Sequence, residues 1–121
     1  MKYRRLLFGV KDPYSDSSDE LFTKAVKENF SYCVSHCDDY RIICENLGIS
    51  SPSDASGLPV IPTLLFKKKQ IFNKGCIPLI KATSSGTSGR KSVVAFDTGG
   101  LLCGLKMVMR VSKLRNLLSP V

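Results

Sequence analysis

The stretch ATSSGTSGRKS, residues 82–92, has the residue types that proteins use to hold phosphate groups. All of its residues except Arg90 and Lys91 are Ser, Thr, Gly or Ala. Glycines let backbone N–H groups converge on an anion, and short hydroxyl side chains add donors without bulk. A nearby cation adds charge-assisted hydrogen bonds. The pattern predicts a phosphate-binding loop over residues 83–92, and the alternative is a flexible turn or linker.

The Walker A pattern, G-x-x-x-x-G-K-[ST], fits this stretch only at its end. Lys91 and Ser92 supply the last two residues, but Ser85 and Arg90 stand where glycines are required. Apolar runs on both sides predict a weak strand at 77–82 and a buried strand at 92–96. Because linkers are not usually held between buried strands, the flanks favour phosphate binding.

Two helices are predicted upstream of this stretch. The first runs from about residue 19 to 35, begins at a capping box formed by Ser17 and Glu20, and has apolar residues at spacings of three and four. The second is capped by Asp38 or Asp39 and ends at Gly48. After a loop at 50–59, the sequence VIPTLLFKKKQIF predicts an extended segment and a short helix.

A last helix is predicted from about residue 99 to 118, capped by Asp97 or Thr98. Lys106, Arg110 and Lys113 share a narrow stripe, and apolar residues cover most of the remaining circumference. A helix this apolar is normally covered on several sides. Little sequence follows it, so we expect the chain to be a fragment or to need a partner.

Composition limits the classes of partner and compartment. The 121 residues suit one domain, and the net charge of +8 indicates an anionic partner such as nucleic acid, nucleotide phosphates, a membrane surface or an acidic protein. No segment reaches the ~20 apolar residues that span a membrane, and the N-terminus lacks the apolar region of a signal peptide. The five cysteines suit reduced thiols. We expect a cytoplasmic protein.

The cysteines do not have the spacing of a zinc site. Cys33, His36 and Cys37 form C-x-x-H-C with a distant Cys44, which is not a standard ligand pattern. The three cysteines and Tyr40 share one helical stripe with apolar residues. We therefore expect core packing and predict no metal site.

The segment Ser84–Gly89 resembles the phosphate loop of the adenylate-forming superfamily, S-S-G-T-T-G followed by x-P-K. Lys91 stands where Pro is usual, and Ser92 where Lys is usual. The upstream segments DDYRIICENLG and LPVIPTLLFKKKQIF are similar to those of the acyl-protein synthetases of the LuxE type, which tolerate loss of the Pro-Lys ending. The resemblance covers most of residues 14–97 and corresponds to the N-terminal third or so of such an enzyme.

The resemblance implies an α/β fold with a helical N-terminal region at 1–57. The start of an adenylating domain, incomplete in this chain, would follow at 58–121. It also implies a ligase of a bioluminescence-related family that uses ATP and Mg²⁺ to convert a fatty or related acid to an acyl-adenylate and then transfers the acyl group to a cysteine thiolate. The residues implied to bind ATP are Thr83, Ser84, Ser85, Gly86, Thr87, Ser88, Gly89 and Lys91.

The resemblance leaves the catalytic residues unassigned. The motifs that seat adenine and ribose, the C-terminal catalytic lysine and the acyl-accepting cysteine of the family have no counterpart here. The implied partners are the acid, the remaining part of the enzyme, and an acyl-transfer or reductase protein.

The alternative function is a non-enzymatic basic module that binds nucleic acid or an anionic membrane surface. The basic run at 67–69 has little aromatic interleaving, which disfavours single-stranded nucleic acid. Protection of the loop by ATP would favour the ligase, and salt-sensitive binding of nucleic acid without ATP binding would favour the module.

Overall fold

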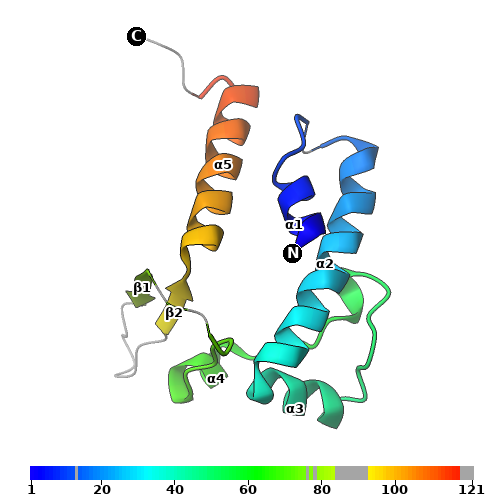
Figure 1. The fold of residues 1–121 in the computed structure, drawn as a ribbon, viewed down its shortest axis with the longest axis vertical. Coiled ribbons are helices and arrows are strands. Elements are labelled where there is room, and N and C mark those ends of the chain that lie inside the picture. The colour runs from blue at the N-terminus through cyan, green and yellow to red at the C-terminus, as the bar shows by residue number, and fades with distance from the viewer. Residues whose placement is uncertain (13, 76, 78, 84–92, 118–121) are drawn as a thin grey trace.

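The computed structural model describes residues 1–12, 14–75, 77, 79–83 and 93–117. Figure 1 shows its arrangement, in which α1 lies against α2, α3 turns back beneath the end of α2, and α5 extends from β2 on the side of α1. The elements, in chain order, are α1 (Lys2–Leu7), α2 (Asp16–His36), α3 (Asp38–Asn46), a 3₁₀ turn (Ala55–Gly57), α4 (Thr63–Lys68), β1 (Ile80–Thr83), β2 (Val93–Phe96) and α5 (Thr98–Leu114).

The fold of the described residues is mixed helical with a small two-stranded sheet, and it is compatible with the α/β class. β1 and β2 pair antiparallel, with Ile80 opposite Phe96 and Thr83 opposite Val93. The division of the chain at residues 57 and 58 and the identity of an adenylating domain stay predictions.

Helix α2 begins earlier than its predicted capping box. Its N-cap is Ser15, whose side chain makes no capping hydrogen bond. The Ser15 Oγ donates to the Asp12 carbonyl at 2.9 Å, and the buried Ser18 donates to the same oxygen at 2.8 Å. These bonds fix the turn before the helix, so Ser17 and Glu20 lie inside the first turns and the predicted capping box is wrong.

Helix α3 follows α2 after the single residue Cys37. Asp38 and Asp39 occupy its first turn instead of capping it, because the N-cap position is taken by Cys37. The predicted end of the helix is confirmed, since Leu47 is the C-cap and Gly48 follows at a φ of 66°. A glycine tolerates this left-handed conformation without steric cost.

The buried side chains of the described region lie mainly between α2 and α3. Ala25, Phe30, Cys37 and Cys44 are each at most 6% exposed. The Phe30 and Tyr40 rings meet edge to face, with centroids 6.0 Å apart and planes at 70°. The predicted core packing is therefore confirmed for Cys37 and Cys44, whereas Cys33 is only half-buried.

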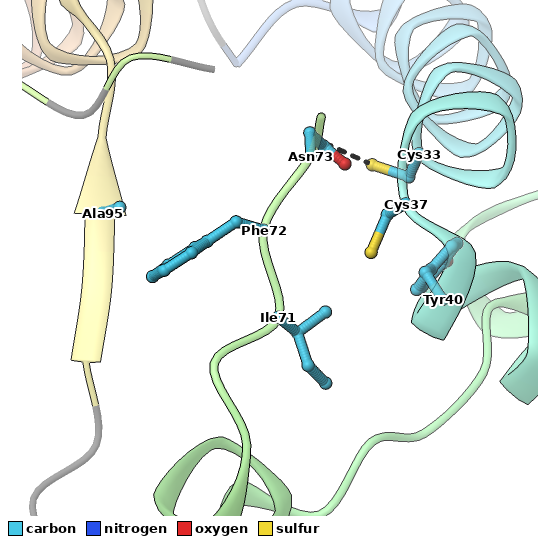
Figure 2. A pocket seen from close by; sticks show the side chains of 7 residues that line it. All are labelled: Cys33, Cys37, Tyr40, Ile71, Phe72, Asn73 and Ala95. Atoms are coloured by element: carbon cyan, nitrogen blue, oxygen red, sulfur yellow. Dashed lines mark hydrogen bonds between the residues drawn. The ribbon is translucent and has the colours of Figure 1, made fainter. Parts of the chain in front are cut away.

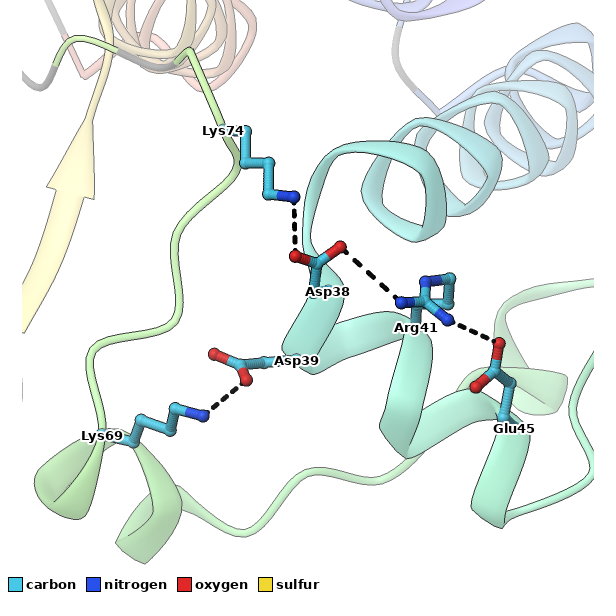
Figure 3. A network of polar contacts seen from close by, with 6 residues as sticks. All are labelled: Asp38, Asp39, Arg41, Glu45, Lys69 and Lys74. Atoms are coloured by element: carbon cyan, nitrogen blue, oxygen red, sulfur yellow. Dashed lines mark hydrogen bonds and ion pairs between the residues drawn. The ribbon is translucent and has the colours of Figure 1, made fainter.

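Two exposed ion pairs attach the segment after α4 to the first turn of α3 (Figure 3). The Lys74 Nζ lies 2.6 Å from Asp38 Oδ2, and the Lys69 Nζ lies 2.5 Å from Asp39 Oδ1. The hydrogen bond from Lys74 lowers the pKa of Asp38. The backbone N–H of Lys74 also donates to the His36 carbonyl at 2.6 Å. These contacts direct the chain from α4 along the α2–α3 corner toward β1.

The predicted strands on either side of the Ser/Gly-rich stretch are confirmed, but β2 is not buried. Val94 and Phe96 are 49% and 42% exposed, whereas Val93 and Ala95 on the opposite face are half-buried. A strand in a two-stranded sheet can cover only one face unless another layer packs on the second. The β-branched residues of 92–96 therefore indicated the strand correctly and its burial wrongly.

Helix α5 is capped by Asp97, as predicted. The Asp97 Oδ1 accepts a hydrogen bond from the Gly100 N–H at 2.5 Å. Asp97 also separates the end of β2 from the start of α5, so one residue fixes the direction in which the helix leaves the sheet.

We predict that Asp97→Ala destabilises α5, because the first turn loses the acceptor for one of its unpaired N–H groups. The loss should be about 1 kcal/mol of unfolding free energy, measured by urea denaturation followed by circular dichroism. Asp97→Asn keeps an acceptor oxygen and should retain most of the stability. Equal destabilisation by both variants would show that the cap does not depend on this hydrogen bond.

Candidate functional site

The sheet brings together the two ends of the predicted phosphate-binding loop. Thr83 is the last residue of β1 and pairs with Val93, the first residue of β2. Directly opposed residues of an antiparallel pair have Cα atoms about 4.5–5.5 Å apart. Residues 84–92 therefore connect two paired strands of one hairpin.

Only one of the predicted ATP-binding residues falls within the described part of the chain. Thr83 is exposed at the end of β1. The other predicted residues, Ser84, Ser85, Gly86, Thr87, Ser88, Gly89 and Lys91, lie outside the described residues. Their role in phosphate binding stays a prediction.

A second candidate feature is a cavity of about 250 Å³ beside the hairpin (Figure 2). Its walls come from the α2–α3 corner, from the segment that leads to β1, and from β2. The lining residues are Cys33, Cys37, Tyr40, Ile71, Phe72, Asn73 and Ala95. The cavity is lined by residues far apart in the sequence. The helical periodicity that identified the cysteines therefore could not identify the residues of the other walls.

Cys33, which lines this cavity, and Cys44, which lies on α3 outside it, have poorly nucleophilic thiols. Burial raises the pKa of the Cys33 thiol, and burial likewise raises the pKa of the Cys44 thiol. Asn73 Nδ2 lies 4.0 Å from the Cys33 sulfur, which is a weak contact. Because the thiolate is the reactive form, these cysteines react slowly near neutral pH.

Tyr40 is also held in its neutral form. Burial is the main cause that raises its pKa to about 12. Its ring closes the core against Phe30, and its phenol faces the same corner as the cysteines. The cavity thus combines apolar walls with uncharged polar groups, which suits an apolar ligand or structural packing better than proton transfer.

His36 is directed to its own helix instead of to the cysteines. Its Nδ1 lies 2.9 Å from the Tyr32 carbonyl and 2.8 Å from the Ser35 Oγ, and its ring stacks on Tyr32 at 4.0 Å between centroids. Within the described ranges, no group of three or more His, Cys, Asp or Glu side chains is arranged to hold a metal ion.

The chain is similar to two bacterial ligases. It is 40% identical over 80 residues to a long-chain-fatty-acid–luciferin-component ligase of Vibrio harveyi, an alignment that covers 64% of this chain and 21% of the relative. It is 30% identical over 84 residues to a long-chain-fatty-acid–luciferin-component ligase of Photorhabdus luminescens, covering 68% of this chain and 72% of the relative. The chain thus spans about a fifth of the first relative and almost three quarters of the second.

Other comparisons add no further relative. No family model matches the chain, and no solved structure matches it. Among the helices of the described residues, none has the length and apolar character needed to cross a bilayer.

We predict that Cys33, Cys37 and Cys44 react slowly with a thiol reagent in the folded protein and rapidly in urea, because the first has a raised pKa and the other two are buried. Differential labelling followed by mass spectrometry measures each rate. Cys103, which is half-buried on α5, serves as the internal reference. The labelling rate of Cys33 should continue to rise at pH values above the pKa of an ordinary thiol, because burial raises the pKa of Cys33. Rapid labelling at neutral pH or one tightly bound zinc ion per chain would contradict the prediction.

Proposed function

The chain belongs to the family of long-chain-fatty-acid–luciferin-component ligases, and we propose that it forms the N-terminal part of an enzyme that activates a fatty acid with ATP. The acyl group would pass from AMP to a thiol. The observation that carries this proposal is the 40% identity over 80 residues to the Vibrio harveyi ligase. The Ser, Gly and Thr residues of the loop also support the proposal, because these residue types are suited to binding phosphate.

In the proposed reaction, the loop at residues 83–92 holds the β- and γ-phosphates while the fatty-acid carboxylate attacks the α-phosphorus. The bond from that phosphorus to the bridging oxygen breaks, and pyrophosphate leaves with increased negative charge. Backbone N–H donors that are already in place stabilise this charge without reorganisation. The Thr83–Val93 pair supports this role, because it closes the ends of the loop and lowers the entropy that phosphate binding would cost.

Bound Mg²⁺ would neutralise part of the phosphate charge. Such ions are commonly held by one or two carboxylates together with substrate phosphates and water. The described residues present no cluster of three acidic, His or Cys side chains, so we assign no protein ligand to the ion. The fit to ATP therefore rests on the hydroxyl groups, the glycines and Lys91 of the loop sequence.

We exclude Cys33, Cys37 and Cys44 as the acceptor thiol and propose that it lies elsewhere in the ligase or on a partner protein. Burial raises the pKa of Cys33 and Cys44, and Cys37 is 4% exposed. An acyl acceptor must be both accessible and readily ionised. These three cysteines instead supply the packing of the α2–α3 corner.

We predict that Gly86→Val lowers acid-dependent ATP–pyrophosphate exchange far more than Lys91→Ala, measured in the complete ligase. A β-branched side chain at Gly86 would obstruct the close approach of backbone donors to phosphate. Loss of one prearranged donor in such a site costs about 10²–10³ in rate. Loss of a partly solvated cation should cost less, because exposed ion pairs contribute about 0–1 kcal/mol.

Gly104→Val is the matched control, because a Cβ at this position on α5 meets no atom within 4 Å. Its exchange rate should equal that of the parent. If Gly86→Val, Lys91→Ala and the control all equal the parent, residues 83–92 are a turn and the proposed phosphate site is wrong.

We also predict that ATP with Mg²⁺ protects the bonds after Arg90 and Lys91 from trypsin, because bound phosphates would cover these cations. Mass spectrometry can compare cleavage there with cleavage after Lys27 on α2, which should not change. The alternative function predicts equal cleavage with and without ATP, together with salt-sensitive binding of nucleic acid.

A further inference from the structure

Helices α1 and α5 carry three cations each and no acidic residue. A groove of about 640 Å³ lies between them. Five of the six cations line it, namely Arg4, Arg5, Lys106, Arg110 and Lys113. The predicted basic stripe of the last helix is thus confirmed as one wall of this groove, and α1 supplies the opposite wall (Figure 1).

Two acidic residues beside the helices of this groove have other partners. Glu28 of α2 accepts the backbone N–H groups of Lys2 and Arg4 at 2.5 and 3.1 Å. Asp97 accepts the N–H of Gly100. In the described part of the chain, no ion pair joins any of the five groove cations to a carboxylate. The positive charge of the groove is therefore available to an external anion.

Two of the arginines that line the groove have notable hydrogen-bonding environments. The Arg110 Nη1 donates to the Phe8 carbonyl at 2.8 Å and so ties α5 to the end of α1. The Arg4 Nε is buried and has no acceptor among the described residues.

An exposed apolar stripe borders the same groove on α5. It consists of Leu102, Leu105, Val108 and Met109, which are between 51% and 63% exposed. Spacings of three and four place these residues on one side of the helix. Leu102 and Met109 also line the groove, so the apolar stripe and the cations form one continuous surface.

We propose that this surface, formed by the stripe and the groove cations, binds an anionic lipid bilayer. Cations beside an exposed apolar face are typical of helices that lie in the membrane interface. Anionic headgroups would pair with the lysines and arginines while the apolar side chains enter the boundary with the acyl chains. Nucleic acid or an acidic peptide would account for the charge but would leave the apolar stripe in water.

The binding mode is peripheral and does not require ATP. Helix α5 has 17 residues, three of them cations, and it cannot span a bilayer. The inference goes beyond the ligase function and does not rest on it. Where both hold, the surface would keep the protein at the lipid phase in which long-chain acids are dissolved.

Sedimentation with lipid vesicles tests the proposal on the full chain. Vesicles of equal parts phosphatidylglycerol and phosphatidylcholine should bind the protein, and vesicles of phosphatidylcholine alone should bind it at least tenfold less. Lys106→Gln with Lys113→Gln should weaken binding about tenfold or more, because each cation near an anionic surface contributes about fivefold. Lys106→Arg with Lys113→Arg should keep the binding.

Matched variants separate this surface from net charge and general apolarity. Lys27→Gln with Lys68→Gln removes the same charge from exposed positions on α2 and α4 and should leave most of the binding. Leu105→Asn with Val108→Asn should weaken binding about tenfold, whereas Val60→Asn with Leu64→Asn, at exposed sites away from this surface, should not. Unchanged circular dichroism would confirm that each variant is folded.

Three results would overturn the proposal. The first is equal binding to both kinds of vesicle or to neither. The second is an equal loss in the two charge variants, which would indicate attraction by net charge alone. The third combines two observations. The parent chain self-associates and does not bind vesicles, and the double variant Leu105→Asn with Val108→Asn is monomeric. That result would show that a second copy covers the stripe.

Discussion

The packing of α3 against α2 forms the corner that positions the segment leading to the hairpin. Phe30, Cys37 and Cys44 are buried there, and Cys37 is the single residue between the two helices. The tight connection exposes the His36 carbonyl and the carboxylates of Asp38 and Asp39 at the corner. Small side chains at this corner allow the helix axes to approach, which larger residues would prevent.

The corner in turn positions the segment that carries the chain to the hairpin. Lys69 and Lys74 pair with the two aspartates, and the Lys74 N–H bonds to His36. Ile71 and Phe72, between the two lysines, face the cavity beside Cys33 and Ala95. The ends of the proposed phosphate loop therefore depend on packing at a site about fifty residues earlier in the chain.

The parts of this fold that follow local rules could be predicted from the sequence. Helices α2, α3 and α5 have the required apolar periodicity, and Asp97 and Gly48 mark helix ends by local chemistry. Helix α1 was not predicted, because six residues are too few for a periodic pattern. Its first turn is completed by Glu28, more than twenty residues away, and local sequence rules contain no such contact.

The candidate sites also divide into one that local sequence reveals and two that only the tertiary structure reveals. The Ser/Gly/Thr loop is a local pattern and could be named from the sequence, although its geometry lies outside the described residues. The cavity at Cys33 needs Ile71, Phe72 and Ala95, and the α1–α5 groove needs Arg4 and Arg5, so both required the tertiary arrangement. The basic stripe on α5 was visible in the sequence, but a stripe alone does not distinguish a solvated face from the wall of a groove.

Helix α5 couples the two proposed sites through its first turn. Strand β2, which carries one end of the loop, is joined to α5 by Asp97 alone, and the Asp97 side chain fixes the Gly100 N–H. A surface that held α5 would therefore restrict the orientation of β2 and, through the Thr83–Val93 pair, of the loop ends. Restricting the ends in advance lowers the ordering cost of binding phosphate, and by thermodynamic linkage phosphate binding would then favour the surface-bound orientation of α5. The short connection at Asp97 thus provides a physical reason for lipid and nucleotide binding to influence each other in this fold.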